Sequence, residues 1–240
     1  MDAKRALTDA DGDFEAAVQI LREKGLAKAA KRTDRENSEG VIAIASDENG
    51  VALVQLKSET DFAAKSPEFN KFAQTLVEVV LADGESGVDS KASELEDLKL
   101  IVKENIEIGQ VLRYESSDVA VLDAYLHGGG QAGVLIEAED VDAEVLHEIA
   151  MHVAFAKPAY LTRDEVPAEE IEKERAALLE ITKSEGKPEQ VWDKIVDGRV
   201  SAWLGDRVLL EQGVFGEKEK VSAKIGSGTI TRFAFVKVGA

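Results

Sequence analysis

One short segment, Lys57-Ser58-Glu59-Thr60-Asp61-Phe62-Ala63-Ala64-Lys65, separates two kinds of apolar pattern in this chain. Before it, apolar residues recur at the spacing of a half-buried strand, and after it they recur at the spacing of one helix face. They are Val51, Leu53 and Leu56 in the strand, and Phe69, Phe72, Ala73, Leu76 and Val80 in the helix. The segment is therefore predicted to be a tight connection from a strand to an amphipathic helix.

The helix carries its own start signal, Ser66-Pro67-Glu68. Ser is a good N-cap, Pro suits the first helical position, and Glu suits the first turn. Because the cap is already supplied, Asp61 and Phe62 have no obvious local role, and such a pair in a loop is typical of a binding site. A second interpretation stays open, in which Phe62 packs against its own helix as a hydrophobic staple.

The composition is that of a soluble globular protein with an acidic surface. With 240 residues, 44% of them hydrophobic, the chain can bury one large core or two small ones. Its 47 Asp and Glu exceed its 29 Lys and Arg, and the net charge of −18 would repel both phosphate backbones and anionic membranes. We therefore expect no direct nucleic-acid partner and no membrane association.

The sequence contains no cysteine, and it shows no signal peptide, long apolar run or lipidation motif. The lack of cysteine excludes disulfides and thiolate sites and fits a reducing compartment. A cytoplasmic location is therefore the default expectation.

The first 25 residues predict two short helices on either side of the turn Asp11-Gly12-Asp13. Two helices of this length cannot close a core by themselves. Residues 24–39 are rich in Lys, Arg and Ala without apolar periodicity, so we expect a linker that runs over the surface.

The middle of the chain predicts two α+β subdomains with the same order of elements. The first has a hairpin over residues 41–56 around Asp47-Glu48-Asn49-Gly50, the Ser66 helix, a loop at 84–90, a helix over 95–102 and a strand over 106–112. The second has a hairpin over 119–136 around Gly128-Gly129-Gly130 and a helix from about Ala143 to Phe155. Its third strand is expected at 229–238. The shared order suggests two related subdomains.

The segment from Arg163 to Gly205 is dominated by charges and predicts an antiparallel helical hairpin. Ser184-Glu185-Gly186-Lys187-Pro188 supplies the stop of one helix and the start of the next. The apolar contact between the helices is thin, and we expect Ile171, Leu178 and Ile181 to meet Val191, Ile195 and Ala202. Such a thin contact is typical of a protruding arm. A spacer role and a direct functional role both stay open.

The sequence contains no motif for common catalytic chemistry. The patterns G-x-x-x-x-G-K-[ST], H-E-x-x-H and G-x-S-x-G are all absent. Only His127, His147 and His152 could act near neutral pH. The helix around Ile149 places His147 and His152 on opposite shoulders, where each is expected to be half-exposed. We therefore expect neither an enzyme nor a metal site nor a cofactor.

Several short motifs, in order along nearly the whole chain, together resemble bacterial elongation factor Ts. They are Met1-Asp2-Ala3-Lys4-Arg5-Ala6-Leu7, Thr60-Asp61-Phe62, Tyr125-Leu126-His127-Gly128, Gly133-Val134-Leu135, Met151-His152-Val153, Lys157-Pro158, Gly186-Lys187-Pro188 and Val196-Asp197-Gly198-Arg199. The chain departs from the family pattern in three places. Ala63 and Ala132 stand where larger residues are usual, and the segment between Lys218 and Thr229 is shorter.

The resemblance implies a guanine-nucleotide exchange factor of translation elongation, which binds the GTPase elongation factor Tu and promotes GDP release. It also implies an α+β fold, with two related α+β core subdomains built on antiparallel sheets, a small N-terminal helical domain and an inserted antiparallel helical hairpin. In the family a further helix precedes the N-terminal pair, so we expect that Met1 is not the native start. The implied domains are residues 1–34 (partial UBA-like helical domain and linker), 35–116 (core N-subdomain), 117–163 plus 206–240 (core C-subdomain) and 164–205 (the arm).

The partner-contacting residues that the resemblance implies are Thr60, Asp61, Phe62, Gly133 and His152. Asp61 and Phe62 would wedge against the GTPase beside its magnesium site, and His152 would support a push towards its phosphate-binding loop. The alternative comes from a different class of protein. It is an acidic adaptor or co-chaperone without exchange activity, in which the Asp-Phe pair is structural.

Overall fold

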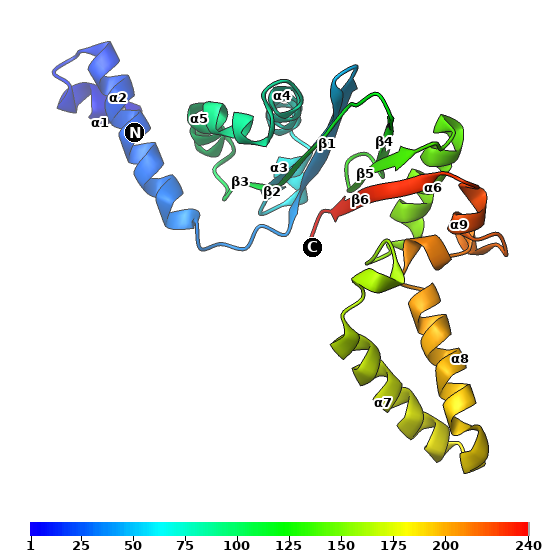
Figure 1. Ribbon diagram of the computed structural model, residues 1–240. Coiled ribbons are helices and arrows are strands. Elements are labelled where there is room, and N and C mark those ends of the chain that lie inside the picture. The colour runs from blue at the N-terminus through cyan, green and yellow to red at the C-terminus, as the bar shows by residue number, and fades with distance from the viewer. Residues whose placement is uncertain (240) are drawn as a thin grey trace. The chain divides into compact units, whose positions relative to one another are not determined.

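The computed structural model describes residues 1–239, apart from the side chains of residues 26 and 30, and contains helices and two three-stranded antiparallel sheets (Figure 1). The helices are α1 (Asp2–Asp9), α2 (Phe14–Ala29), α3 (Asp61–Ala64), α4 (Pro67–Asp83), α5 (Ala92–Val102), α6 (Ala143–Ala156), α7 (Ala168–Ser184), α8 (Trp192–Gly205) and α9 (Val221–Lys224). The strands are β1 (Glu39–Asp47), β2 (Gly50–Ser58), β3 (Glu107–Glu115), β4 (Ala120–His127), β5 (Ala132–Glu139) and β6 (Thr229–Lys237). The predicted α+β fold class is confirmed.

The chain divides into two compact units. The first comprises residues 1–115, 126–133 and those from 236 onward, and the second comprises residues 116–125 and 134–235. The domain boundaries expected from the sequence remain a proposal.

The first unit is built on the sheet β1-β2-β3, in which the predicted hairpin is confirmed. β1 pairs antiparallel with β2 from Glu39 opposite Ser58 to Asp47 opposite Gly50. The turn is held by Asp47, whose carboxylate accepts a hydrogen bond from the N–H of Asn49 at 2.7 Å. β2 is the central strand and is buried along almost all of its length, which places its end at Ser58 firmly in the core.

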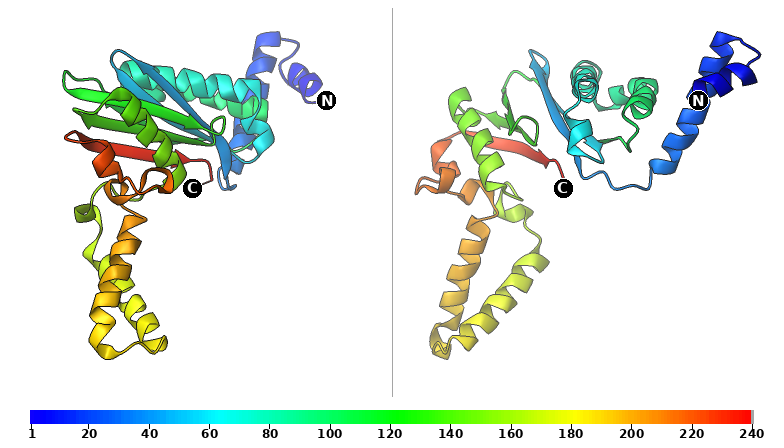
Figure 2. Two further views of the ribbon diagram at one scale, coloured as in Figure 1. Left: turned by 90° about the vertical axis from the view of Figure 1, so that its right-hand side faces the viewer. Right: turned by 180° about the vertical axis from the view of Figure 1, so that it is seen from behind.

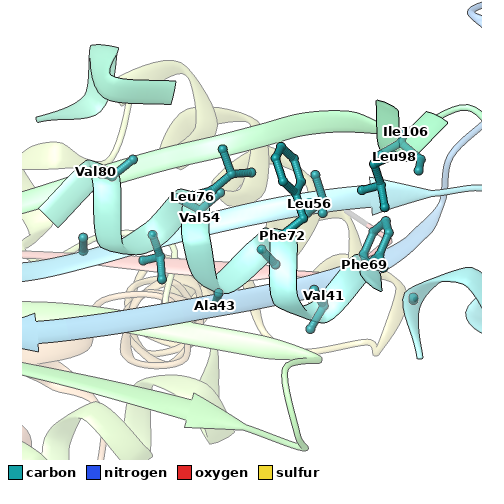
Figure 3. Packing of buried hydrophobic residues seen from close by; sticks show 14 of the residues in the cluster. Val41, Ala43, Val54, Leu56, Phe69, Phe72, Leu76, Val80, Leu98 and Ile106 are labelled. Atoms are coloured by element: carbon teal, nitrogen blue, oxygen red, sulfur yellow. The ribbon is translucent and has the colours of Figure 1, made fainter. Parts of the chain in front are cut away.

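Helix α4 covers one face of this sheet, as its apolar spacing predicts (Figure 3). Its N-cap is Ser66, whose side chain accepts from the N–H of Phe69, and Pro67 follows at the first helical position. Figure 3 shows one side of the helix facing the strands. The contacting residues are Phe69, Phe72, Leu76 and Val80 on the helix and Val41, Ala43, Val54 and Leu56 on the strands. Each large apolar side chain buried here contributes about 1.5–3 kcal/mol to folding.

The N-terminal helix pair is confirmed, but the linker predicted over residues 24–39 is wrong in its first part. Helix α2 continues to Ala29, and a 3₁₀ turn follows over Ala30–Arg32. The cause is a tertiary contact, since α2 packs on α5: Arg22 pairs with Asp97 at 2.7 Å, and Gly25 lies directly against Leu100. Such contacts override the weak local pattern.

The loop predicted at residues 84–90 is also wrong, because the chain forms the 3₁₀ helix η2 (Glu85–Lys91) there. Gly84 ends α4 with a φ of +86°, a conformation that favours glycine. Glu85 then accepts a hydrogen bond from the N–H of Arg113 in β3. This bond to the sheet fixes a segment whose sequence reads as irregular.

The second unit contains the sheet β4-β5-β6, whose third strand is the one expected at residues 229–238. Helix α6 packs its predicted face, Leu146, Ile149, Ala150 and Val153, into a core shared with residues of β5 and β6. Asp142 caps this helix by accepting from the N–H groups of Glu144 and Val145.

Helices α7 and α8 form the predicted hairpin, the arm, in which they are in contact and diverge away from the turn that joins them (Figure 2). The predicted contact residues Val191, Ile195 and Ala202 are wrong, because the buried ones are Val196, Val200 and Leu204, whereas Ile171 and Leu178 of α7 pack against this cluster as predicted. Val191 and Ala202 are exposed, as is Ile181 on α7. The rotation of α8 is set by Arg199, which donates to the buried hydroxyl of Thr182 at 3.1 Å and to the carboxylate of Glu185 at 2.8 Å.

The arm has its own small apolar cluster, separate from the core under α6. The chain enters and leaves the arm through a parallel bridge between Tyr160 and Val208. We therefore predict that replacing residues 167–206 by a short Gly-Ser linker leaves cooperative thermal unfolding of the remainder in place. Calorimetry checks this. Leu146→Ala serves as the comparison, since it should cost about 2–5 kcal/mol. Loss of a cooperative transition in the deletion variant would make the arm part of the core.

Candidate functional site

The segment at residues 57–65 forms a tight turn that begins where β2 ends. Thr60 has an extended backbone, and its hydroxyl accepts a hydrogen bond from the N–H of Ala63 at 3.2 Å. Thr60 is therefore the N-cap of α3, a single helical turn. Ser58 adds a second constraint, because its hydroxyl donates to the carbonyl of Thr60 at 3.0 Å.

Glu104, which lies after α5, holds this turn in place. Its Oε2 accepts from the backbone N–H groups of Glu59 and Thr60, each at 3.1 Å, and its Oε1 accepts from the hydroxyl of Thr60 at 2.6 Å. In return, the Glu59 carboxylate accepts from the N–H of Asn105 at 2.6 Å. Three hydrogen bonds to one partly buried carboxylate make a strong clamp, because bonds to charged groups are the stronger ones. Glu104 was not predicted from the sequence, because no local signal marks it.

Phe62 is 84% exposed. Its neighbours Ala63 and Ala64 are buried, and one helical turn cannot bury both of them together with residue 62. The ring therefore points away from the core, and the staple interpretation is wrong. A large exposed ring on a clamped turn contributes little to the stability of the free chain.

Asp61 forms an ion pair with Lys65 one turn later, with 2.6 Å between Oδ2 and Nζ. The hydrogen bond from Lys65 lowers the pKa of the Asp61 carboxyl, so this group is ionised at neutral pH. Both side chains are largely exposed, so the pair adds little to stability. Asp61 also lines an open groove whose other wall includes Gly128, Gly129 and Gln131, which leaves room for a partner beside the carboxylate.

Gly133 lies in the same unit but is buried. A Cβ placed on it would come within 2.7 Å of Leu53 and 2.8 Å of Ile42. The residue therefore allows the chain at Gly133 to pass close to Leu53 and Ile42 of the same unit, which is a packing role. Gly133 is buried in the free chain, and its contact with a partner stays a prediction.

His152 is buried in the second unit, with 1% of its surface exposed, so the half-exposed position predicted from the helix pattern is wrong. The reason lies outside the helix, in a turn that covers it. Its Nε2 lies 3.0 Å from Oε1 of Gln212, and its Nδ1 accepts from the N–H of Phe215 at 3.1 Å. Burial lowers the pKa of His152, so the ring is neutral at pH 7. Neither Gln212 nor Phe215 was identified from the sequence.

His147 is half-exposed, as predicted, with 47% of its side chain accessible, and its Nδ1 lies 2.9 Å from Oδ2 of Asp123. Burial raises the pKa of the Asp123 carboxyl. Within residues 1–239, no three His, Asp or Glu side chains are grouped so that they could hold a metal ion. In the same range, no helix has the length and apolar character needed to cross a membrane.

Comparison with known proteins accounts for nearly the whole chain. The family model described as "Elongation factor TS" matches residues 59–240. This chain belongs to the elongation factor Ts family. The elongation factor Ts of Clavibacter michiganensis subsp. michiganensis is 38% identical over 258 residues, covering all of this chain and 93% of the relative. Those of Deinococcus radiodurans and Lacticaseibacillus casei (strain BL23) are each 36% identical, covering all of this chain and 94% and 86% of the relatives.

Membership of the elongation factor Ts family places the chain among the elongation factors of protein synthesis. The structure brings Thr60, Asp61 and Phe62 together on one turn of the first unit. His152 belongs to the second unit. The partner-binding role of these residues stays a prediction.

The clamp at Glu104 should contribute measurably to the stability of the chain. In Glu104→Ala the N–H groups of Glu59 and Thr60 and the hydroxyl of Thr60 lose their acceptor, so the free energy of unfolding should fall by about 1–3 kcal/mol. Urea denaturation measures the loss. Glu94→Ala is the matched control, because Glu94 forms a surface ion pair with Lys91 and should change stability by no more than about 1 kcal/mol. Equal losses in the two variants would show that Glu104 is no clamp.

Proposed function

We propose that this chain is a guanine-nucleotide exchange factor, which binds the GTPase elongation factor Tu and promotes GDP release during translation elongation in the cytoplasm. The observation that carries the proposal is the exposed ring of Phe62 on a turn fixed by Thr60 and Glu104. The chain's own residues make and break no covalent bond in this function.

The physical basis of exchange is linkage between two ligands of the GTPase. A factor that binds the nucleotide-free GTPase more tightly than the GDP-bound form must weaken GDP binding by the same coupling free energy. The factor therefore speeds nucleotide release and does not determine whether GDP or GTP binds next. The binding energy has to come from contacts that form only in the complex.

Phe62 can supply such a contact because its ring is solvent-exposed in the free chain. Burying a Phe ring in a partner contributes about 1.5–3 kcal/mol, which corresponds to roughly 10- to 100-fold in affinity. The turn is already fixed by its cap and by Glu104, so little conformational entropy is lost on binding. The net charge of −18 favours approach to a basic surface of the partner.

Asp61 adds a negative charge next to that ring. We propose that its carboxylate approaches the magnesium site of the GTPase and competes for the ion or its water shell, where the ion is the largest local charge. In the free chain Lys65 holds the carboxylate at 2.6 Å, so this ion pair has to open or move in the complex.

Phe62→Ala should slow GDP release from elongation factor Tu by about 10- to 100-fold at subsaturating factor and leave the thermal unfolding midpoint unchanged. Stopped-flow release of a fluorescent GDP analogue measures the rate. The matched control is Ile101→Ala, which removes another exposed apolar side chain of the same unit. If the unaltered chain itself leaves the GDP off-rate unchanged at micromolar concentration, the exchange function is wrong and the adaptor or co-chaperone alternative is favoured.

Asp61→Asn and Lys65→Met separate the charge of the carboxylate from its ion pair. Asp61→Asn should lower the rate of GDP release while binding of the GTPase largely survives, because the shape of the side chain is kept. Lys65→Met removes the same ion pair but leaves the charge, so exchange should be retained. Release rates and dissociation constants of both variants check this. If both variants lost the same share of the GDP release rate, the ion pair, and not the free carboxylate, would be needed for exchange.

A further inference from the structure

Asn105 is a buried polar residue that the exchange function proposed above leaves without a role. Only 4% of its surface is exposed, and it lies in the short segment between α5 and β3. Its side-chain Nδ2 donates to the carbonyl of Arg35 at 2.8 Å, and it lies 3.4 Å from the carbonyl of Thr33 and 3.3 Å from Oε1 of Glu107. A buried amide needs such partners. Asn105 is therefore bonded to residues 33–38, which lead from the N-terminal helix pair to β1 and which we call the linker.

The linker also contacts residues 59–62, the contact turn that carries Phe62. Nη1 of Arg35 donates to both carboxylate oxygens of Glu59, with 3.3 Å to each. The same carboxylate accepts from the backbone N–H of Asn105 at 2.6 Å. The side chain of Glu59, which is 19% exposed, therefore joins the linker, the contact turn and Asn105.

Glu104 and Asn105 hold these two segments from adjacent positions in the chain. The carboxylate of Glu104 accepts from the backbone of the contact turn, and the amide of Asn105 donates to the backbone of the linker. Both ends of their short segment are fixed, because Lys103 is the C-cap of α5 and Ile106 is fully buried. The linker and the contact turn are thus bonded to one anchored support, so release of the linker removes part of what holds the turn.

We infer that Asn105 is a positioning residue for nucleotide exchange, which couples the linker after the N-terminal helix pair to the turn that presents Phe62. The inference rests on the exchange function proposed above and deepens it. A residue that is 4% exposed does not touch the GTPase, so Asn105 acts through Glu59 and the contact turn. A turn that is fixed before binding loses little conformational entropy on binding, whereas a loosened turn has to be ordered by the partner and binds more weakly.

Asn105→Ala removes the bonds to the linker and keeps the backbone N–H that Glu59 accepts. The second-order rate constant for GDP release from elongation factor Tu should fall by roughly 3- to 10-fold. The rate at saturating factor should stay unchanged, because the loosened turn weakens binding and still carries its ring. Stopped-flow release of a fluorescent GDP analogue over a range of factor concentrations measures both. If Asn105→Ala fails to fold, Arg35→Gln serves, since the side chain of Arg35 is 55% exposed and its loss breaks the contact with Glu59.

The matched control is Val80→Ala, which shortens a buried side chain of the same unit near the C-terminal end of α4. It should lower the thermal unfolding midpoint and leave GDP release unchanged at a temperature well below that midpoint. If Val80→Ala slowed release as much as Asn105→Ala does, lost stability alone would explain the effect and the inference would be wrong.

A double-mutant cycle with Phe62→Ala tests whether Asn105 acts through the contact turn. In the Phe62→Ala background, Asn105→Ala should lower the rate constant by less than about twofold, because the ring that it positions is gone. The rate is taken as the acceleration above the spontaneous GDP off-rate, at factor concentrations where Phe62→Ala still accelerates release. A purely structural role of Asn105 predicts the same loss with and without the ring of Phe62, and that result would overturn the inference.

Amide hydrogen exchange in the free chain tests the positioning role without the GTPase. In Asn105→Ala the amides of Thr60 and Ala63 should exchange roughly 3-fold faster or more, since the turn opens more often. The amide of Val145, which is capped by Asp142 in the second unit, should not change. If the amides of Thr60 and Ala63 exchange as in the unaltered chain, the inference is wrong, whereas the exchange function is judged by Phe62→Ala. If the unaltered chain fails to speed GDP release, both are wrong.

Discussion

The hydrogen bonds that the Glu104 carboxylate accepts are the constraint on which the candidate site depends. The register of β1, β2 and β3 fixes where β2 ends, and Glu104 then fixes the two residues that follow it. With the backbone held there, the cap of Thr60 starts α3, and the burial of Ala63 and Ala64 leaves Phe62 no position in the core. Exposure of the ring is thus a consequence of the fold. A chain without the clamp could turn the same ring inward.

In the second unit, too, a buried polar group holds the backbone beside an aromatic residue. There a buried neutral imidazole takes the place of the carboxylate, and it accepts the one backbone N–H that fixes Phe215 in a positive-φ turn. In both units a polar group that is partly or fully buried accepts a hydrogen bond from a backbone N–H, and an exposed aromatic ring lies in the turn that this bond holds. Buried polar groups need such partners, so replacing either group disturbs the display of a ring as well as local stability.

Sequence patterns predicted the elements whose signals are local. The Asn49-Gly50 turn, the Ser66-Pro67 helix start and the apolar face of α6 each lie within one element, and the structure confirms them. The errors concern residues whose position depends on distant parts of the chain. Helix α2 extends because α5 covers it, α8 is rotated by Arg199, and His152 is buried because residues 212–215 cover it. The apolar periodicity of a helix cannot indicate that a residue 60 positions away, here Gln212, covers one side of it at His152.

The two alanines that depart from the family pattern show how burial changes the interpretation of a substitution. Ala63 follows Phe62 directly, so its small size could be taken as a weaker contact with the partner. Its side chain is buried, however, and so is that of Ala132. A larger residue at either position would alter packing within this unit. The small size of these two residues therefore affects packing inside the chain. It does not change the exposed ring of Phe62 or the carboxylate of Asp61.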